Sequence, residues 1–424
     1  MTERKDGKRT GGGLGPVLLT VLLDLLGFGL VIPLISFYAE DYGATERQAI
    51  ALLGVYSLAQ FAFAPVWGAL SDRYGRRPIM LLSIGATALS LAAFALSQTL
   101  WLLFLFRLLH GAFAANISTA QAYVADITAP ADRARGMGLI GAAFGVGFTL
   151  GPWMGGELSV LGITAPIWLA AALSAVNFVW AWFGLPESRP VHERAVHPRR
   201  LARLAVWRGL SHPVVGLAIL LTFAATLAFA MMEFTFPLVA EHRWAMNERG
   251  VGRMFGLMGG IGIVVQGMLI HSLVRWLGEA RLVGTGYVLN AAGLVLLALA
   301  MPGATLYGAC AVLALGSSLA NPSLQSLISR GAGEDEQGTI LGINQSLSAL
   351  ARAIAPWLAL VLYDPSRRVA PFFAAALIMV AALVLAVPAT RRTRVSLLPR
   401  APESDSSSPA RKASGSAGGP DPSA

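Results

Sequence analysis

Four charged residues stand inside long apolar stretches, where a charge is costly unless it has a partner or a task. They are Asp24, Arg107, Glu233 and Arg352. A carboxyl group in such surroundings can take up and release a proton as its environment changes. A guanidinium stays protonated, so it serves to hold a carboxylate ionised or to bind an anion. These residue types predict proton binding linked to a second ligand rather than covalent catalysis, and an enzyme is not expected.

Each of the four also has a structural interpretation. Asp24 lies about nine residues into its stretch, or ~14 Å along a helix, and a permanent pair with an arginine would explain it. Arg107 would then be its static counterion or a packing anchor. Glu233, one turn before Pro237, is a second proton site, a contact for a cationic substrate, or a solvated group near the interface. The partner of Arg352 could be Glu233, a substrate carboxylate or a group with a purely structural role.

The elements that position these residues are membrane spans. Of the 424 residues, 55% are hydrophobic and 13% are charged, whereas a globular domain carries about 25% charged residues. Continuous apolar runs near 20 residues indicate spanning helices rather than barrel strands. We expect an all-α fold of twelve transmembrane helices, near 15–38, 47–70, 78–97, 99–125, 136–158, 164–185, 213–240, 250–274, 281–300, 304–329, 337–362 and 370–388.

The positive charges predict the topology. With the N-terminus inside, 24 of the 32 Lys and Arg residues fall in inner segments and six in outer loops, which places both termini in the cytoplasm. This distribution accounts for the net charge of +9 without nucleic acid as a partner. The expected parts are a cytoplasmic N-terminus (1–14), two six-helix halves (15–185 and 213–388), a cytoplasmic linker (186–212) and a disordered cytoplasmic tail (389–424).

The two halves carry matching landmarks at an offset near 204 residues. Pro33-Leu34 matches Pro237-Leu238, Gly75 matches Gly278, Ala115-Asn116 matches Ala320-Asn321, and Pro152 matches Pro356. Such spacing predicts two halves in the same orientation, related by an axis along the membrane normal. Proteins of this kind bind a substrate near the membrane midplane between the halves, and they alternate access to it by rocking.

The segment 68–78 is a charged turn between two apolar runs. Gly75 permits a tight turn, and Asp72 is suited to the N-terminus of an opposing helix. The arginines of this segment can pair with Asp126 at the inner end of the fourth helix. The resulting conformational latch would consist of Gly68, Asp72, Arg73, Gly75, Arg76, Arg77 and Asp126. An ordinary topology-setting loop would explain the arginines, but it would leave Asp72 and Gly75 without a reason.

A second motif is a glycine-rich run in the fifth helix, suited to close helix packing. Its members are Gly141, Gly145, Gly147, Gly151, Pro152, Gly155 and Gly156. With segment 68–78 and the Arg107-Leu-Leu-His-Gly sequence, this run resembles the motifs of the major facilitator superfamily. The first half is similar to the drug:proton antiporters of the tetracycline-exporter type. The resemblance implies the fold, antiport, proton coupling by Asp24 and Arg107, and contact of Asp72 with the eleventh helix, which starts near Gln337.

The resemblance also has limits that concern the cargo. Tetracycline exporters carry acidic residues in the third and ninth helices, where this chain has Ser90 and Asn290. Tetracycline is therefore not the expected substrate. Further candidates for the substrate cavity are polar or adaptable residues within spans: Phe28, Asn116, Gln121, Met231, Phe234, Asn290, Asn321, Gln325, Asn344, Gln345 and Arg352. Ordinary packing between helices is the alternative role for most of them.

No cofactor is expected. The sequence has no phosphate-binding Gly-x-x-x-x-Gly-Lys-Ser/Thr motif, the six histidines show no metal-site spacing, and Cys310 is the one cysteine. We therefore predict a monomeric secondary transporter of the bacterial cytoplasmic membrane that exchanges protons for hydrophobic small molecules in export. A proton symporter that imports a metabolite is one alternative. A transport-inactive receptor or scaffold of the same fold is another.

Overall fold

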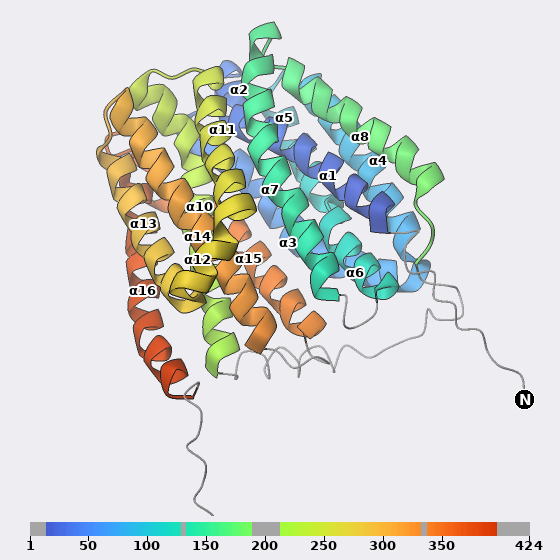
Figure 1. Ribbon diagram of the computed structural model, residues 1–424. Coiled ribbons are helices and arrows are strands. Elements are labelled where there is room, and N and C mark those ends of the chain that lie inside the picture. Colours follow the sequence, from blue (N-terminus) through green and yellow to red (C-terminus); the bar gives the residue numbers. More distant parts are fainter. Residues whose placement is uncertain (1–13, 129–132, 189–212, 332–336, 397–424) are drawn as a thin grey trace, which may run out of the picture.

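The computed structural model describes residues 14–128, 133–188, 213–331 and 337–396, and the regular structure in these ranges is helical (Figure 1). The first half contains α1 (Leu14–Val31), η1 (Ile32–Leu34), α2 (Ile35–Asp41), α3 (Glu46–Tyr74), α4 (Arg76–Ala95), α5 (Leu100–Phe113), α6 (Asn116–Ile127), α7 (Arg133–Leu158), η3 (Ser159–Leu161) and α8 (Ala165–Gly184). The second half contains α10 (Pro213–Trp244), α11 (Glu248–Val264), η5 (Val265–Leu269), α12 (Ile270–Leu277), α13 (Glu279–Leu299), α14 (Ala304–Gly331), α15 (Gln337–Leu362) and α16 (Ala370–Ser396).

Within the described ranges, eleven helices are long and apolar enough to cross a membrane, and Ala370–Ala386 is a shorter apolar helix. These helices lie within a few residues of the twelve predicted spans. The last one, α16, continues to Ser396, beyond its predicted end near 388. Most of the predicted N-terminus (1–14), linker (186–212) and tail (389–424) lies outside the described residues, so these segments stay predictions.

Two glycines at equivalent places of the two halves adopt the same backbone conformation. Gly75 joins α3 to α4 with φ 107° and ψ 159°, and Gly278 joins α12 to α13 with φ 78° and ψ 154°. Both φ angles lie in the region that favours glycine. Each glycine therefore turns the chain between two spans with a single residue, as the repeat predicts. We call the end of the bundle that carries Gly75 the loop end, and the opposite end, where α3 begins at Glu46, the far end.

The fourth span is broken, although the sequence predicts one helix over 99–125. Ala114, with φ −74° and ψ 67°, separates α5 from α6, and the N–H of Ala115 donates to the Phe113 carbonyl at 2.7 Å. These angles are those of an inverse γ-turn. The equivalent span of the second half, α14, is continuous even though it contains Pro322. The break is therefore a feature of the first half alone and does not come from a proline.

Helix α7 packs between α1 and α11 (Figure 1). On the α1 side, a Cβ atom at Gly147 would lie 2.6 Å from the Leu25 Cβ, and one at Gly151 would lie 2.7 Å from the Gly29 Cα. Gly155 similarly faces the Leu30 backbone. Since these contacts leave no room for a side chain, the glycines set the distance between α1 and α7.

The glycine run of α7 does not act as one strip. Gly156 faces the second half, where a Cβ would lie 2.8 Å from the Gly252 Cα of α11. Gly141 and Gly145 have nothing within 4 Å of the position of a Cβ. Of the run predicted to pack closely, only the part from Gly147 onward does so.

Two alanine substitutions in α7 are expected to differ in their effect on stability. Gly147→Ala should destabilise the protein by about 1–3 kcal/mol because the new methyl group overpacks against Leu25. Gly145→Ala should be neutral, or stabilise by up to about 1 kcal/mol, through helix propensity alone. Thermal unfolding of the detergent-solubilised protein measures both effects. Equal melting temperatures for the two variants would contradict the close packing of α1 on α7.

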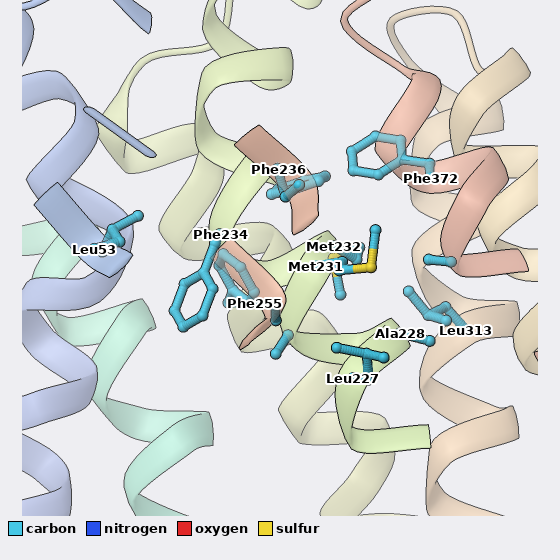
Figure 2. Packing of buried hydrophobic residues seen from close by; sticks show 14 of the residues in the cluster. Leu53, Leu227, Ala228, Met231, Met232, Phe234, Phe236, Phe255, Leu313 and Phe372 are labelled. Atoms are coloured by element: carbon cyan, nitrogen blue, oxygen red, sulfur yellow. The ribbon is translucent and has the colours of Figure 1, made fainter. Parts of the chain in front are cut away.

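The largest apolar core lies in the second half and extends to the far end of the first half. Figure 2 shows part of it around α10, where Met231 and Met232 lie on the side nearer Leu313 and Phe372. Phe234 lies on the opposite side of α10, toward Leu53 of α3. The chain thus directs one face of α10 into its own half and the other face toward the first half.

Candidate functional site

A cavity of about 360 Å³ lies between the two halves and takes its wall from both of them. The first half contributes residues of α1, α3, α4, α5, α6, α7 and α8, and the second half contributes residues of α10 and α15. Eight of the predicted site residues line the wall: Asp24, Phe28, Asn116, Gln121, Glu233, Phe234, Gln345 and Arg352. Residues more than 300 positions apart in sequence therefore meet at one site.

Asp24 receives a hydrogen bond from an amide rather than an ion pair. The Asn116 Nδ2 donates to the Asp24 Oδ1 at 2.9 Å, and Asn116 is only 3% exposed. Among the described residues, no cation lies within 4.0 Å of the Asp24 carboxylate. The interpretation of Asp24 as half of a permanent pair with an arginine therefore does not fit this conformation. The carboxylate remains available to the cavity.

Arg107 is buried behind the wall, and the predicted ion pair with Asp24 is not among its contacts with described residues. Its guanidinium carbon lies 4.4 Å from the centre of the Tyr56 ring, a cation–π arrangement. Its Nη1 donates to the His110 Nδ1 at 3.3 Å, so His110 carries its own proton on Nε2. A Cβ at Gly111 would collide with the Tyr56 backbone, so α5 and α3 meet closely at this point. Arg107 is therefore held by Tyr56 and His110, and not by Asp24.

Glu233 and Arg352 face the same cavity from α10 and α15. They lie within electrostatic range of each other. Neither forms a hydrogen bond or an ion pair within 4.0 Å with another described residue. Glu233 is 5% exposed, so the placement rules out the solvated position near the interface. The second half thus presents one acidic and one basic group to a ligand.

Aromatic rings supply the apolar part of the wall. Phe28 lies 5.3 Å from Tyr56 and 5.9 Å from Phe148, measured between ring centres, and Phe144 stacks on Phe148. Sequence reasoning found Phe28 and Phe234 but missed Tyr56, Phe144 and Phe148. An aromatic residue in an apolar run carries no signal that separates a wall position from a core position. The wall therefore combines apolar rings with a few polar groups, which is the usual composition of a small-molecule site.

Five predicted cavity residues are not on the wall. Met231 is fully buried in the second-half core (Figure 2). Asn290 accepts a hydrogen bond from Ser317 at 2.8 Å, and Asn344 is buried. Asn321 and Gln325 of α14 are exposed away from the cavity. All five residues lie on the predicted helices, but on faces of these helices that do not line the cavity.

In segment 68–78, Arg76 is the central residue. It is 7% exposed, and it reaches Asp72 at 2.8 Å and Asp126 at 3.0 Å. Its backbone N–H donates to Glu187 at 2.9 Å. Of the three arginines predicted to pair with Asp126, only Arg76 does so among the contacts of described residues. This cluster ties the loop end of α3 and α4 to that of α6.

The neighbouring arginines have other partners. Arg73 lies over the ring of Tyr74, and Arg77 donates to the Trp182 carbonyl and lies 6.0 Å from the Trp182 ring centre. The side chains at the start of α15, including Gln337, lie outside the described residues. The contact of Asp72 with the eleventh helix therefore stays a prediction.

At the far end, the described residues of the two halves are joined by charged contacts. Glu46 accepts two hydrogen bonds from Arg368, at 2.9 and 2.6 Å, and a further one from the Tyr363 hydroxyl. Glu157 of α7 accepts from Arg249 at 2.6 Å and from Arg253 at 2.7 Å, both on α11. In the sequence alone, Arg249, Arg253 and Arg368 count among the outer positive charges, with no partner assigned to them. We call these two groups the far-end clamps.

The sequence profile of the Major Facilitator Superfamily matches residues 17–356. The chain belongs to this superfamily. The class C tetracycline resistance protein of Escherichia coli is 33% identical over 82% of this chain and 89% of its own length. Multidrug resistance protein 2 of Bacillus subtilis is 28% identical over 87% of this chain and 93% of its own. These relatives cover both halves of the fold.

A solved relative of the superfamily is the human organic anion transporter MFSD10, also named TETRAN. It superposes with a TM-score of 0.67 at 27% identity, over 89% of this chain and 99% of its own. The all-helical architecture in two halves is therefore that of a membrane transporter. The members of the family are transporters and not enzymes, so the site is read as a transport site.

Proposed function

We propose that this chain is a proton-coupled exporter of amphipathic small molecules in a bacterial cytoplasmic membrane, working as a monomer with both termini in the cytoplasm. One observation carries the proposal: the cavity contains one carboxyl group from each half, Asp24 and Glu233, and neither is in an ion pair with a described residue. Carboxyl groups in this position can exchange a proton for a bound cation. The names of the tetracycline and multidrug resistance relatives support export as the direction.

The far-end clamps support alternating access as the mechanism. They join the halves on the side that the charge distribution places outside, so the described conformation is the one closed to the exterior. In the cycle, cargo enters from the cytoplasm, the clamps open, and protons from the outside replace the cargo on Asp24 and Glu233. A ligand drives such a switch only by binding the two conformations with different affinity.

A second candidate is transport of organic anions. Arg352 is a guanidinium on the wall without an ion pair to a described residue, and the solved relative is an organic anion transporter. An anion binds best when Asp24 and Glu233 are protonated, because their negative charges then disappear from the cavity. Protons and an anion would therefore move in the same direction, whereas protons and a cation compete and move in opposite directions.

Proteoliposomes with a pH-sensitive dye inside distinguish these candidates. A gradient of tetraphenylphosphonium directed inward should drive protons outward if the protein exchanges cations for protons. A gradient of 1-naphthoate should carry protons inward if it moves anions. Vesicles without protein, with and without an uncoupler, provide the baseline. Cargo flux without any proton movement would overturn proton coupling, and binding without flux would favour the receptor or scaffold alternative.

A further inference from the structure

The break in the fourth span is held by side chains of other helices. Three successive carbonyls at the break, those of Ala112, Phe113 and Ala114, accept hydrogen bonds from Trp67, Ser83 and Gln60 respectively. The Ser83 hydroxyl also accepts from the Ala115 N–H at 3.0 Å. Backbone groups freed inside a membrane must find such partners. The backbone groups at the break therefore have hydrogen-bond partners, and α6 is a separate rigid segment beyond the break.

Helix α6 joins the cavity to the loop end. Its first residue, Asn116, donates to Asp24, and Asp126 near its last turn holds Arg76 at 3.0 Å. Ten residues separate these positions, which corresponds to about 15 Å of rigid helix. Tyr123, between them, donates to the Pro186 carbonyl at 2.8 Å. One short helix thus links the carboxyl in the cavity to the buried arginine of segment 68–78.

We infer that Asn116 is a positioning residue that transmits the protonation state of Asp24 along α6 to the Arg76 cluster at the loop end. The inference rests on the proposed function, in which Asp24 binds the transported proton. Because the fourth span has no continuous hydrogen-bond ladder across Ala114, α6 can tilt about the break independently of α5. The cluster at its other end then moves with it.

The chemistry of an amide explains why Asn116 suits this role. Its Nδ2 donates to an ionised Asp24, while its Oδ1 is buried without a hydrogen-bond partner. A protonated Asp24 has an O–H to donate, and the Oδ1 is the acceptor that this proton requires. Proton uptake therefore gives Asp24 a donor that the Asn116 Oδ1 can accept, which changes the hydrogen bonding between the two side chains. Asn116 starts α6, so a change in this contact acts on the first turn of the helix.

The other titratable or charged groups around Asp24 do not contact α6 in a comparable way. Tyr56, Glu233 and Arg352 line the same cavity from α3, α10 and α15, and His110 lines it from α5. Arg107 lies behind Tyr56. Among the described residues, the hydrogen bond from Asn116 is therefore the link between Asp24 and α6.

Hydrogen exchange in nanodiscs tests the inference, with Asp24→Asn as a mimic of the protonated state. In the otherwise native chain, Asp24→Asn should change amide exchange of segment 68–78 by about fivefold or more, the lower bound of typical coupling between sites. In an Asn116→Leu background, the same substitution should leave this segment unchanged. Gln121→Leu is the matched control, because Gln121 is a cavity amide on α6 without a hydrogen bond to Asp24.

The outcomes separate this inference from the proposed function. The inferred link is wrong if Asp24→Asn changes the amide exchange of segment 68–78 equally in the native chain and in the Asn116→Leu background. It is also wrong if Asp24→Asn stops proton-driven transport without any change in the segment. Unimpaired proton-driven transport by Asp24→Asn would instead overturn the proposed function. Should Asn116→Leu fail to fold, Asp126→Asn breaks the link at its other end, and it should equally remove the response of the segment to Asp24→Asn.

Discussion

Asp24→Asn is expected to reduce proton-driven cargo accumulation to the level of vesicles without protein. Asparagine has nearly the same shape and can still bond to Asn116, but it cannot release a proton. Cargo that moves down its own gradient should remain detectable, and binding of a neutral cargo should change by less than about tenfold, or 1.4 kcal/mol. Accumulation driven by an imposed pH gradient, compared with counterflow at equal pH, measures the two activities separately.

Asp41→Asn is the matched control for this substitution. Asp41 ends α2 on the same span and is exposed at the far end, away from the cavity. It should retain native accumulation. If Asp24→Asn accumulated cargo as well as Asp41→Asn does, the proton would have to bind elsewhere, and Glu233 would be the remaining acidic candidate on the described cavity wall.

Glu46→Gln is expected to shift the protein away from the conformation closed at the far end. Glu46 accepts from Arg368 and Tyr363, both of the second half, so it contributes to the closed state and to no other described contact of comparable strength. Hydrogen bonds to a charged group contribute about 1.5–3 kcal/mol each, and partial exposure reduces this. We expect roughly a tenfold change in the ratio of closed to open forms, which corresponds to 1.4 kcal/mol.

Distances between spin labels on the far ends of α3 and α15 measure this ratio. Asp364→Asn is the control, since Asp364 lies in the same loop as Arg368 but bonds within the loop to Ser366. The pKa of Asp364 lies below its usual value because the hydroxyl and the backbone N–H of Ser366 donate to it. The control therefore also removes a negative charge at neutral pH. An equal shift in both variants would mean that charge alone, and not the clamp, closes this end.

The spans and the connections between them were open to prediction because the membrane acts on each segment locally. A run of apolar residues crosses the bilayer whatever its neighbours are, and a charge between two runs returns the chain to water. Gly75 and Gly278 were also predictable, since a one-residue connection requires a conformation that glycine tolerates best. Family resemblance added an expected mechanism, which these local rules do not contain.

The faces of the helices were less predictable. Asp24 and Glu233 were found because an intramembrane carboxyl seldom lies against lipid. Asn290 and Asn344 are neutral amides, and buried amides occur both between packed helices and on ligand sites. Nothing in their spacing separates these two cases, so their assignment to the cavity failed.

The sequence by itself determined that this protein is a twelve-span transporter with acidic groups at membrane depth and a charged turn after its second span. The tertiary structure decided that Arg107 binds Tyr56 and His110 instead of Asp24, and that the fourth span breaks at Ala114. The reason is the same in both cases. Hydropathy and turn chemistry act along the chain, whereas the partner of a buried guanidinium and the donors that cap freed carbonyls come from other helices, whose approach only the packed fold fixes.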